Sequence, residues 1–185
     1  MIMILDCTLR EGRQARQCNF DIDQSTVLAQ AISELGVNMI EAGHPLISNE
    51  EAERVKAIVS AASVPVLAHA RARREDIDAV LAVNAPWVGL FASVNQISLE
   101  TKFKGKTRAD VLEMFADAIA YAKANGLKVR ATIEDAARTT MSDLLDMTRT
   151  AELAGADRVC FADSVGALSP SVLSQIKHSL RAYPP

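Results

Sequence analysis

Short apolar runs and amphipathic segments alternate along the whole chain. The apolar runs are rich in Val, Ile, Leu, Met or Phe and predict six strands: Ile2–Asp6, Asn38–Ala42, Val64–Ala68, Trp87–Ala92, Lys128–Ile133 and Arg158–Ala162. Segments with helical spacing lie between and after them: Asp23–Leu35, Ser48–Ala62, Asp76–Val83, Arg108–Asn125, Ser142–Ala154 and Ser169–Tyr183. Runs that are apolar on both faces suit parallel strands covered by helices on both sides. The pattern therefore predicts six βα units with a parallel sheet and right-handed crossovers.

Three of the predicted helices stop at a glycine. Gly36, Gly126 and Gly155 each stand between a helical segment and the strand that follows it. Glycine adopts the left-handed conformation that commonly ends a helix, so these positions predict helix-to-strand turns.

Two architectures are compatible with this alternation, an open doubly wound sheet and a (β/α)8 barrel. No Gly-x-Gly-x-x-Gly follows the first run, which weakens a dinucleotide-binding interpretation. Polar residues stand at the ends of several runs: Arg10 and Glu11, Glu41, His69, Ser93, Glu134 and Asp135, Asp163 and Ser164. A barrel collects its active site at the carboxyl ends of many strands, whereas an open sheet uses one switch point. This distribution favours an α/β fold of the TIM-barrel type.

The predicted barrel is incomplete. A full barrel has eight βα units and about 250 residues, whereas this chain has 185 residues and six predicted units. We therefore expect residues 1–185 to be the N-terminal portion of a TIM-barrel catalytic domain, with strands seven and eight and a C-terminal lid domain absent. Open sheet edges associate readily, so we expect another segment or subunit to cover them.

Composition limits the classes of partner and the compartment. The net charge is −3, which does not suggest a nucleic-acid surface. No apolar stretch approaches the roughly 20 residues of a membrane helix. Cys7, Cys18 and Cys160 form no Cys-x-x-Cys motif, so a reduced, cytoplasmic setting is expected. Cys160 lies inside an apolar run and is expected to be a small core residue.

The first predicted strand leads directly into a charged segment. Residues 6–14 read Asp-Cys-Thr-Leu-Arg-Glu-Gly-Arg-Gln, so the opposite charges of Arg10 and Glu11 stand at the end of a buried strand. Charge in such a place is costly unless it is solvated, paired or metal-bound. The segment is therefore either a candidate site or an exposed ion pair in a βα loop.

The third and fifth predicted strands carry further candidates. Side chains alternate along a strand, so Arg130, Thr132 and Glu134 share one face. An arginine, a hydroxyl and a carboxylate together suit an oxyacid, because Arg grips a carboxylate through two parallel hydrogen bonds. The alternative is that Arg130 and Glu134 pair at the surface. His69 stands at the end of the third run, where a lone histidine is more often structural than a ligand.

Four motifs resemble one enzyme family. Residues 6–14 are similar to the first-strand signature of the acyl-CoA/2-oxoacid condensing enzymes, namely the homocitrate, isopropylmalate and citramalate synthases, which are relatives of the hydroxymethylglutaryl-CoA lyases. Ile40-Glu-Ala-Gly-His-Pro, Arg130-Ala-Thr-Ile-Glu-Asp and Phe161-Ala-Asp-Ser-Val-Gly resemble the second, fifth and sixth strand motifs, in the same order. Glu rather than Asp at position 11, together with Arg130, leans toward the homocitrate branch.

The resemblance implies a role for each matching residue. Arg10 corresponds to the catalytic arginine that steadies charge on the 2-oxo oxygen, and Glu11 corresponds to a metal-binding carboxylate. We predict Arg10 and Glu134 as catalytic residues and Glu11 as a metal ligand. The predicted substrate-binding residues are Gln14, Glu41, His69, Arg130, Thr132 and Ser164.

The implied reaction is a Claisen-type condensation of acetyl-CoA with a 2-oxoacid by an acyltransferase that needs Mg, Mn or Zn. The family's His-x-His metal ligands belong to the seventh strand, which this sequence lacks, so a homodimer or a companion subunit is expected to supply ligands. The alternatives are a non-catalytic or partner-dependent subunit and a lyase on the same frame. Arg13 stands where most of these synthases carry Glu, and we hypothesise that it favours a more anionic oxoacid.

Overall fold

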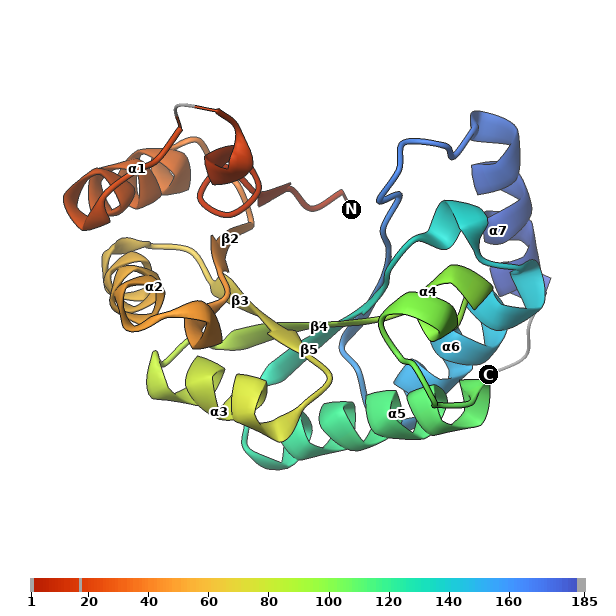
Figure 1. Cartoon of the computed structure of the whole chain (residues 1–185). Helices are drawn as coiled ribbons and strands as arrows, with labels where there is room; N and C mark the ends of the chain where they lie inside the picture. The colour runs from red at the N-terminus through yellow and green to blue at the C-terminus, as the bar shows by residue number, and fades with distance from the viewer. Residues whose placement is uncertain (1, 17, 183–185) are drawn as a thin grey trace. The chain divides into compact units, whose positions relative to one another are not determined.

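The chain divides into two compact units in a computed structural model that describes residues 2–16 and 18–182. Unit 1 comprises Met1–Gly89 with Gly126–Lys128, and unit 2 comprises Leu90–Asn125 with Val129–Pro185. Each unit combines parallel strands with the helices that connect them (Figure 1).

Unit 1 contains the first three strands and the first half of the fourth, and their order in the sheet is their order in the sequence. The strands are β1 (Leu5–Asp6), β2 (Met39–Gly43), β3 (Val66–Arg71) and β4 (Trp87–Ala92). β1, β2 and β3 pair in parallel, with Leu5 beside Met39 and Ile40 beside Val66. The helices are α1 (Ile22–Glu34), α2 (Asn49–Ala61) and α3 (Arg74–Ala82), with single 3-10 turns η1 (Gly12–Gln14) and η2 (Pro45–Ile47). In Figure 1, α1 and α2 lie side by side.

The core of unit 1 fixes the strands whose ends carry the candidate residues. Met39, Leu67 and Trp87 form a buried cluster against which Leu5 packs. Leu9, in the turn after β1, is completely buried. Burying one such side chain contributes about 1.5–3 kcal/mol, so the turn after β1 is anchored by its own apolar residue.

Unit 2 contains the second half of β4, then β5 (Lys128–Ile133) from Val129 onward, and β6 (Arg158–Phe161). β5 and β6 pair in parallel, with Arg130 beside Arg158 and Thr132 beside Cys160. The helices are α4 (Gln96–Thr101), α5 (Arg108–Ala124), α6 (Met141–Leu153) and α7 (Pro170–Ala182), with the 3-10 turn η3 (Ala136–Arg138). The fully buried side chains include Phe115, Ile119, Ile133 and Met147.

The predicted alternation is confirmed, and β4 and β5 have the predicted bounds. The predicted stops also hold, because Gly36, Gly126 and Gly155 all have positive φ. The last predicted helix reached Tyr183, which lies outside the described residues.

Three local expectations need correction. The first strand is Leu5–Asp6 rather than Ile2–Asp6, because Ile2, Met3 and Ile4 are exposed. The third strand is Val66–Arg71 rather than Val64–Ala68, and it includes His69. Cys160, expected in the core, is only partly buried, as are all residues of β6. Within the described part of the chain, no helix is long and apolar enough to cross a membrane.

Candidate active site

A tight turn after β1 carries the first candidate residues. The carbonyl oxygen of Cys7 accepts hydrogen bonds from the backbone N–H groups of Arg10 (3.1 Å), Glu11 (2.8 Å) and Gly12 (3.2 Å). The N–H of Gln14 donates to the Glu11 carbonyl at 3.0 Å and continues the turn as η1. These bonds hold the backbone from which Arg10, Glu11 and Gln14 project.

The guanidinium of Arg10 lies between two carboxylates. Its Nε donates to Oε1 of Glu41, and its Nη1 donates to Oε2 of Glu11. Nε2 of Gln14 also donates to Oε2 of Glu11, at 3.4 Å. Glu41 is 1% exposed, whereas the Glu11 side chain is 59% exposed. Arg10 is therefore fixed on its buried side by Glu41, while Glu11 faces solvent.

His69 joins the same cluster from the neighbouring strand. Its Nε2 lies 3.0 Å from Oε1 of Glu41, the oxygen that also accepts from Arg10. Glu41 lies in β2 beside Leu67 of β3, and His69 lies two residues farther along β3 on the same face. Unit 1 thus brings together Arg10, Glu11, Gln14, Glu41 and His69, which are five of the predicted site residues.

A second charged cluster in unit 1 was not found by sequence reasoning. Asp76 is completely buried and accepts from Nε and Nη2 of Arg71 at 2.6 and 2.8 Å and from the Arg71 N–H at 3.0 Å. Nε2 of His44 lies 3.2 Å from Oδ1 of the same carboxylate. No local pattern marks this cluster, because His44 and Asp76 are 32 residues apart.

The surroundings shift the pKa values of this cluster. Burial raises the pKa of Asp76, but the hydrogen bonds and positive charge of Arg71 outweigh burial and hold that pKa below its usual value. Burial lowers the pKa of His44 by more than the neighbouring Asp76 carboxylate raises it. The Arg71–Asp76 pair is therefore ionised at neutral pH, and His44 favours its neutral form.

Unit 2 contains the remaining predicted residues. Glu134 directly follows β5, its N–H donates to the Ala92 carbonyl at 2.9 Å, and its Oε2 lies 2.6 Å from Nζ of Lys102. Arg130 and Thr132 lie within β5 at alternate positions. Among the described residues, the buried Oγ1 of Thr132 has no hydrogen-bond partner. Glu134 has a cationic partner that sequence reasoning did not identify.

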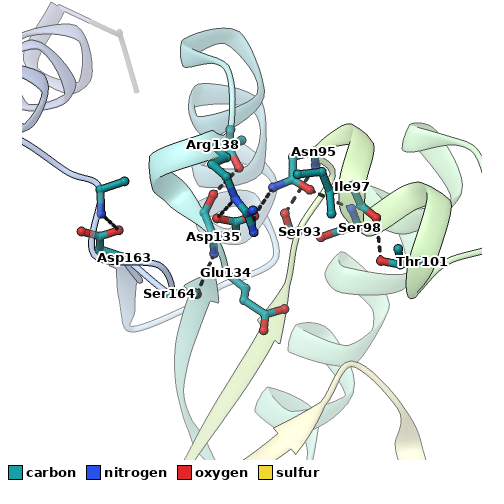
Figure 2. Close-up of polar contacts among 12 residues, drawn as sticks. Ser93, Asn95, Ile97, Ser98, Thr101, Glu134, Asp135, Arg138, Asp163 and Ser164 are labelled. Atoms are coloured by element: carbon teal, nitrogen blue, oxygen red, sulfur yellow. Dashed lines mark hydrogen bonds and ion pairs between the residues drawn. The ribbon is translucent and has the colours of Figure 1, made fainter.

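Asp135 organises the end of β5, as Figure 2 shows. Its carboxylate accepts from Nδ2 of Asn95 at 2.8 Å and from Nε of Arg138 at 2.9 Å, while its N–H donates to Oγ of Ser164 at 3.0 Å. The hydrogen bond from Arg138 holds the pKa of Asp135 below its usual value. Asp135 has φ of 58°, a left-handed conformation that Asp tolerates better than most residues. Ser164 thus contacts the backbone next to Glu134.

The residues described here do not form a complete metal site. Among residues 2–16 and 18–182, no group of three or more His, Cys, Asp or Glu side chains is placed to hold a metal ion. Glu11 offers one exposed carboxylate, which is a single donor. The expectation that Arg10 and Glu11 share one mouth with Arg130, Thr132 and Glu134 concerns residues of different units and stays a prediction.

Comparisons with known proteins identify relatives along the whole chain. The sequence profile of the HMGL-like family matches residues 1–183. A homocitrate synthase from Saccharolobus solfataricus is 41% identical over 182 residues, and one from Sulfurisphaera tokodaii is 40% identical over 182 residues. Each alignment covers 96% of this chain and 39% of the relative. The chain therefore spans about two fifths of the length of these curated relatives.

Solved structures agree with the predicted fold. The hydroxymethylglutaryl-CoA lyase from Pseudomonas aeruginosa matches 98% of this chain with a TM-score of 0.82 and 16% identity, and the match covers 64% of that chain. The HMG-CoA lyase from Brucella melitensis matches 100% of this chain with a TM-score of 0.81 and 18% identity, covering 69% of that chain. At such low identity the likeness concerns the fold alone, and it confirms a partial TIM barrel.

Proposed function

The chain belongs to the HMGL-like family, and we propose that it carries part of the active site of an acyltransferase that condenses acetyl-CoA with a 2-oxoacid. The reaction class is taken from the homocitrate synthases to which the chain is 40–41% identical. Residues 1–185 would be the N-terminal portion of the catalytic domain. The cytoplasmic setting stays a prediction.

The placement of Arg10 between Glu11 and Glu41 is the observation that carries this proposal. Condensation moves negative charge onto the 2-oxo oxygen as the new carbon–carbon bond forms. A hydrogen-bond donor held in place before the reaction stabilises that charge without reorganising. Arg10 satisfies this requirement, because its guanidinium is held on two sides and remains partly exposed.

The other predicted residues would bind the oxoacid. Gln14, Glu41 and His69 form one cluster with Arg10 in unit 1. In unit 2, Arg130 would bind the substrate carboxylate, assisted by the Thr132 hydroxyl, whose hydrogen-bonding capacity is unused among the described residues. Glu134, whose carboxylate is paired with Lys102, would be a catalytic residue. Ser164 accepts from the backbone N–H of Asp135 and would thereby fix the segment that carries Glu134.

A bound divalent ion would act as a Lewis acid toward the oxoacid. Glu11 is the candidate donor, but the described residues provide no complete set of ligands around it. We therefore assign no step to the ion. Further ligands would come from outside the described residues, in a homodimer, a companion subunit or additional chain. Because the set of metal ligands among the described residues is incomplete, a second candidate function is that of a partner-dependent subunit of such an enzyme.

Thiol release tests the proposal. The chain is mixed with acetyl-CoA, Mg²⁺ or Mn²⁺ and one of a panel of 2-oxoacids, and free CoA is titrated. We expect one oxoacid to stimulate thiol release, and Arg10→Gln to reduce the rate about 100-fold or more. Binding of the same oxoacids is measured by calorimetry. The proposal is contradicted if the chain shows no oxoacid-dependent thiol release and also no oxoacid binding that depends on Arg10.

A further inference from the structure

A buried charged cluster lies beside the turn that carries Arg10, and the proposed chemistry does not use it. Nη1 of Arg13 donates to Oε2 of Glu51 at 3.0 Å, and Nη2 of Arg54 donates to the same oxygen. Glu51 is 8% exposed and Arg54 is 3% exposed, and the Arg13 side chain is 18% exposed. One carboxylate thus serves two guanidinium groups away from bulk water.

Glu51 is placed by the start of α2. Ser48 caps this helix and accepts from the Glu51 N–H at 3.1 Å, so Glu51 lies in the first turn, where a carboxylate is favoured. Its other oxygen, Oε1, packs against the backbone of Gly43, at the end of β2. A Cβ atom on Gly43 would overlap this oxygen, and φ of 139° at Gly43 also favours glycine.

The cluster connects α2 to the segment that contains the catalytic turn. Arg13 lies within η1, between Glu11 and Gln14. Nη1 of Arg54 donates to the Phe20 carbonyl at 3.3 Å, which holds the chain just before α1. Gly43, against which Glu51 packs, is two residues from Glu41. Glu51 therefore touches both the turn and the strand whose side chains meet at Arg10.

We propose that Glu51 is a positioning residue, which acts through Arg13 to hold the turn of Arg10, Glu11 and Gln14 against the end of β2. Buried ion pairs add little net stability, but removing one partner leaves an uncompensated charge. If Glu51 loses its charge, Arg13 has to move toward water, and η1 moves with it. The role of Glu51 in catalysis rests on the proposed function, whereas its structural role in fixing the turn does not.

Hydrogen exchange and kinetics test this role in Glu51→Gln. We expect the amides of Arg10, Glu11 and Gly12 to exchange about tenfold faster or more, because the turn opens locally. The amide of Phe115, in the middle of α5, is the internal reference and should not change. In the condensation assay, kcat should fall about 100-fold, since a displacement of a catalytic group by about 1 Å can cost that much, while KM for acetyl-CoA is retained.

Matched variants make the outcome decisive. Glu53→Gln removes the same charge from an exposed position of α2 and should change neither readout. Arg13→Lys should retain more protection of the turn than Arg13→Met. If Glu51→Gln does not fold, Arg13→Met provides the test, because it leaves the Arg54–Glu51 pair intact. Unchanged exchange of the turn amides in Arg13→Met would overturn the proposal. Faster exchange of the turn in the variants would support the positioning role even if the wild type shows neither condensation activity nor Arg10-dependent oxoacid binding, a result that contradicts the proposed function alone.

Discussion

Oε1 of Glu41 lies 3.0 Å from Nε2 of His69 and also accepts from Nε of Arg10, so one buried oxygen joins the turn after β1 to strands β2 and β3. A carboxylate that is 1% exposed is tolerated only with such partners. The orientation of Arg10 therefore depends on Glu41 as much as on its own turn.

Replacing Glu41 with Gln should destabilise the fold strongly. The change removes the charged acceptor that Arg10 and His69 share, while Arg10 keeps Glu11 and its partial exposure, so we expect a loss of about 1–3 kcal/mol. Urea unfolding followed by circular dichroism measures the effect. Glu11→Gln is the control, because the 59% exposed Glu11 pairs with Arg10 in water and should contribute less than about 1 kcal/mol. Equal losses in the two variants would contradict this account.

Arg10→Lys should retain the fold and lose activity. Lysine keeps one positive charge but cannot donate to Glu41 and Glu11 from the two ends of a planar group. We expect thiol release in the condensation assay to fall about 100-fold, and the urea midpoint to fall by less than in Glu41→Gln, because lysine keeps a positive charge beside Glu41. Arg16→Lys, an exposed position near the same turn, is the control. Full activity of Arg10→Lys would remove the case for a guanidinium-specific role.

The stability of the fold should decrease as the pH falls below about 6.5. Burial holds the pKa of His44 below its unfolded value, so the unfolded chain binds this proton first. The contribution of neutral His44 is thus complete above the unfolded pKa and is lost as pH falls through the folded pKa. Urea midpoints measured from pH 8 to pH 5 should show a slope that His44→Gln flattens.

A second loss of stability should follow near the acid limit. The folded pKa of Asp76 is held below its unfolded value of about 3.9, so its contribution is present above that pH and disappears as the pH falls through the folded pKa. Asp76→Asn should be destabilised at neutral pH and lose this acid step. An acid step of the same size in Asp76→Asn would show that other carboxylates cause it.

Asn95→Ala should destabilise unit 2 by about 1–2 kcal/mol. The Asn95 side chain accepts from the Ser98 N–H as the cap of α4 and donates to the buried Asp135 carboxylate. Both bonds disappear in the variant, and Asp135 retains Arg138. Urea unfolding gives the loss, with the exposed neighbour variant Gln96→Ala as the reference. A loss no larger than that of Gln96→Ala would contradict the role given to Asn95.

The structure gives Arg13 a second role beside the hypothesis that it favours a more anionic oxoacid. Arg13 donates to Glu51 and is largely buried, so its charge already has a partner. Whether Arg13 also selects a more anionic oxoacid stays a prediction. The ratio of kcat/KM for two-carboxylate over one-carboxylate oxoacids, measured in Arg13→Glu and Arg13→Met, tests the prediction. An unchanged ratio in both variants would end it.

Much of the fold was predictable because its signals are local. Apolar runs located every strand, and β4 and β5 have the predicted bounds. Gly36, Gly126 and Gly155 mark helix ends, since only a residue without a side chain adopts their φ without strain. The short helix α4 and the 3-10 turns were missed, because they are too brief to show a period. The candidate residues of unit 1 were found as motif positions.

What the sequence determined by itself is the order of strands and helices and the residue types at strand ends, because side-chain periodicity and turn chemistry act between near neighbours. Only the tertiary structure decided which charges meet. Arg13 and Glu51 are 38 residues apart, His44 and Asp76 are 32 apart, and Asn95 and Asp135 are 40 apart. Such pairs depend on strand register and on the rotation of each helix against its sheet. No local pattern encodes these quantities, since they follow from how the whole core packs.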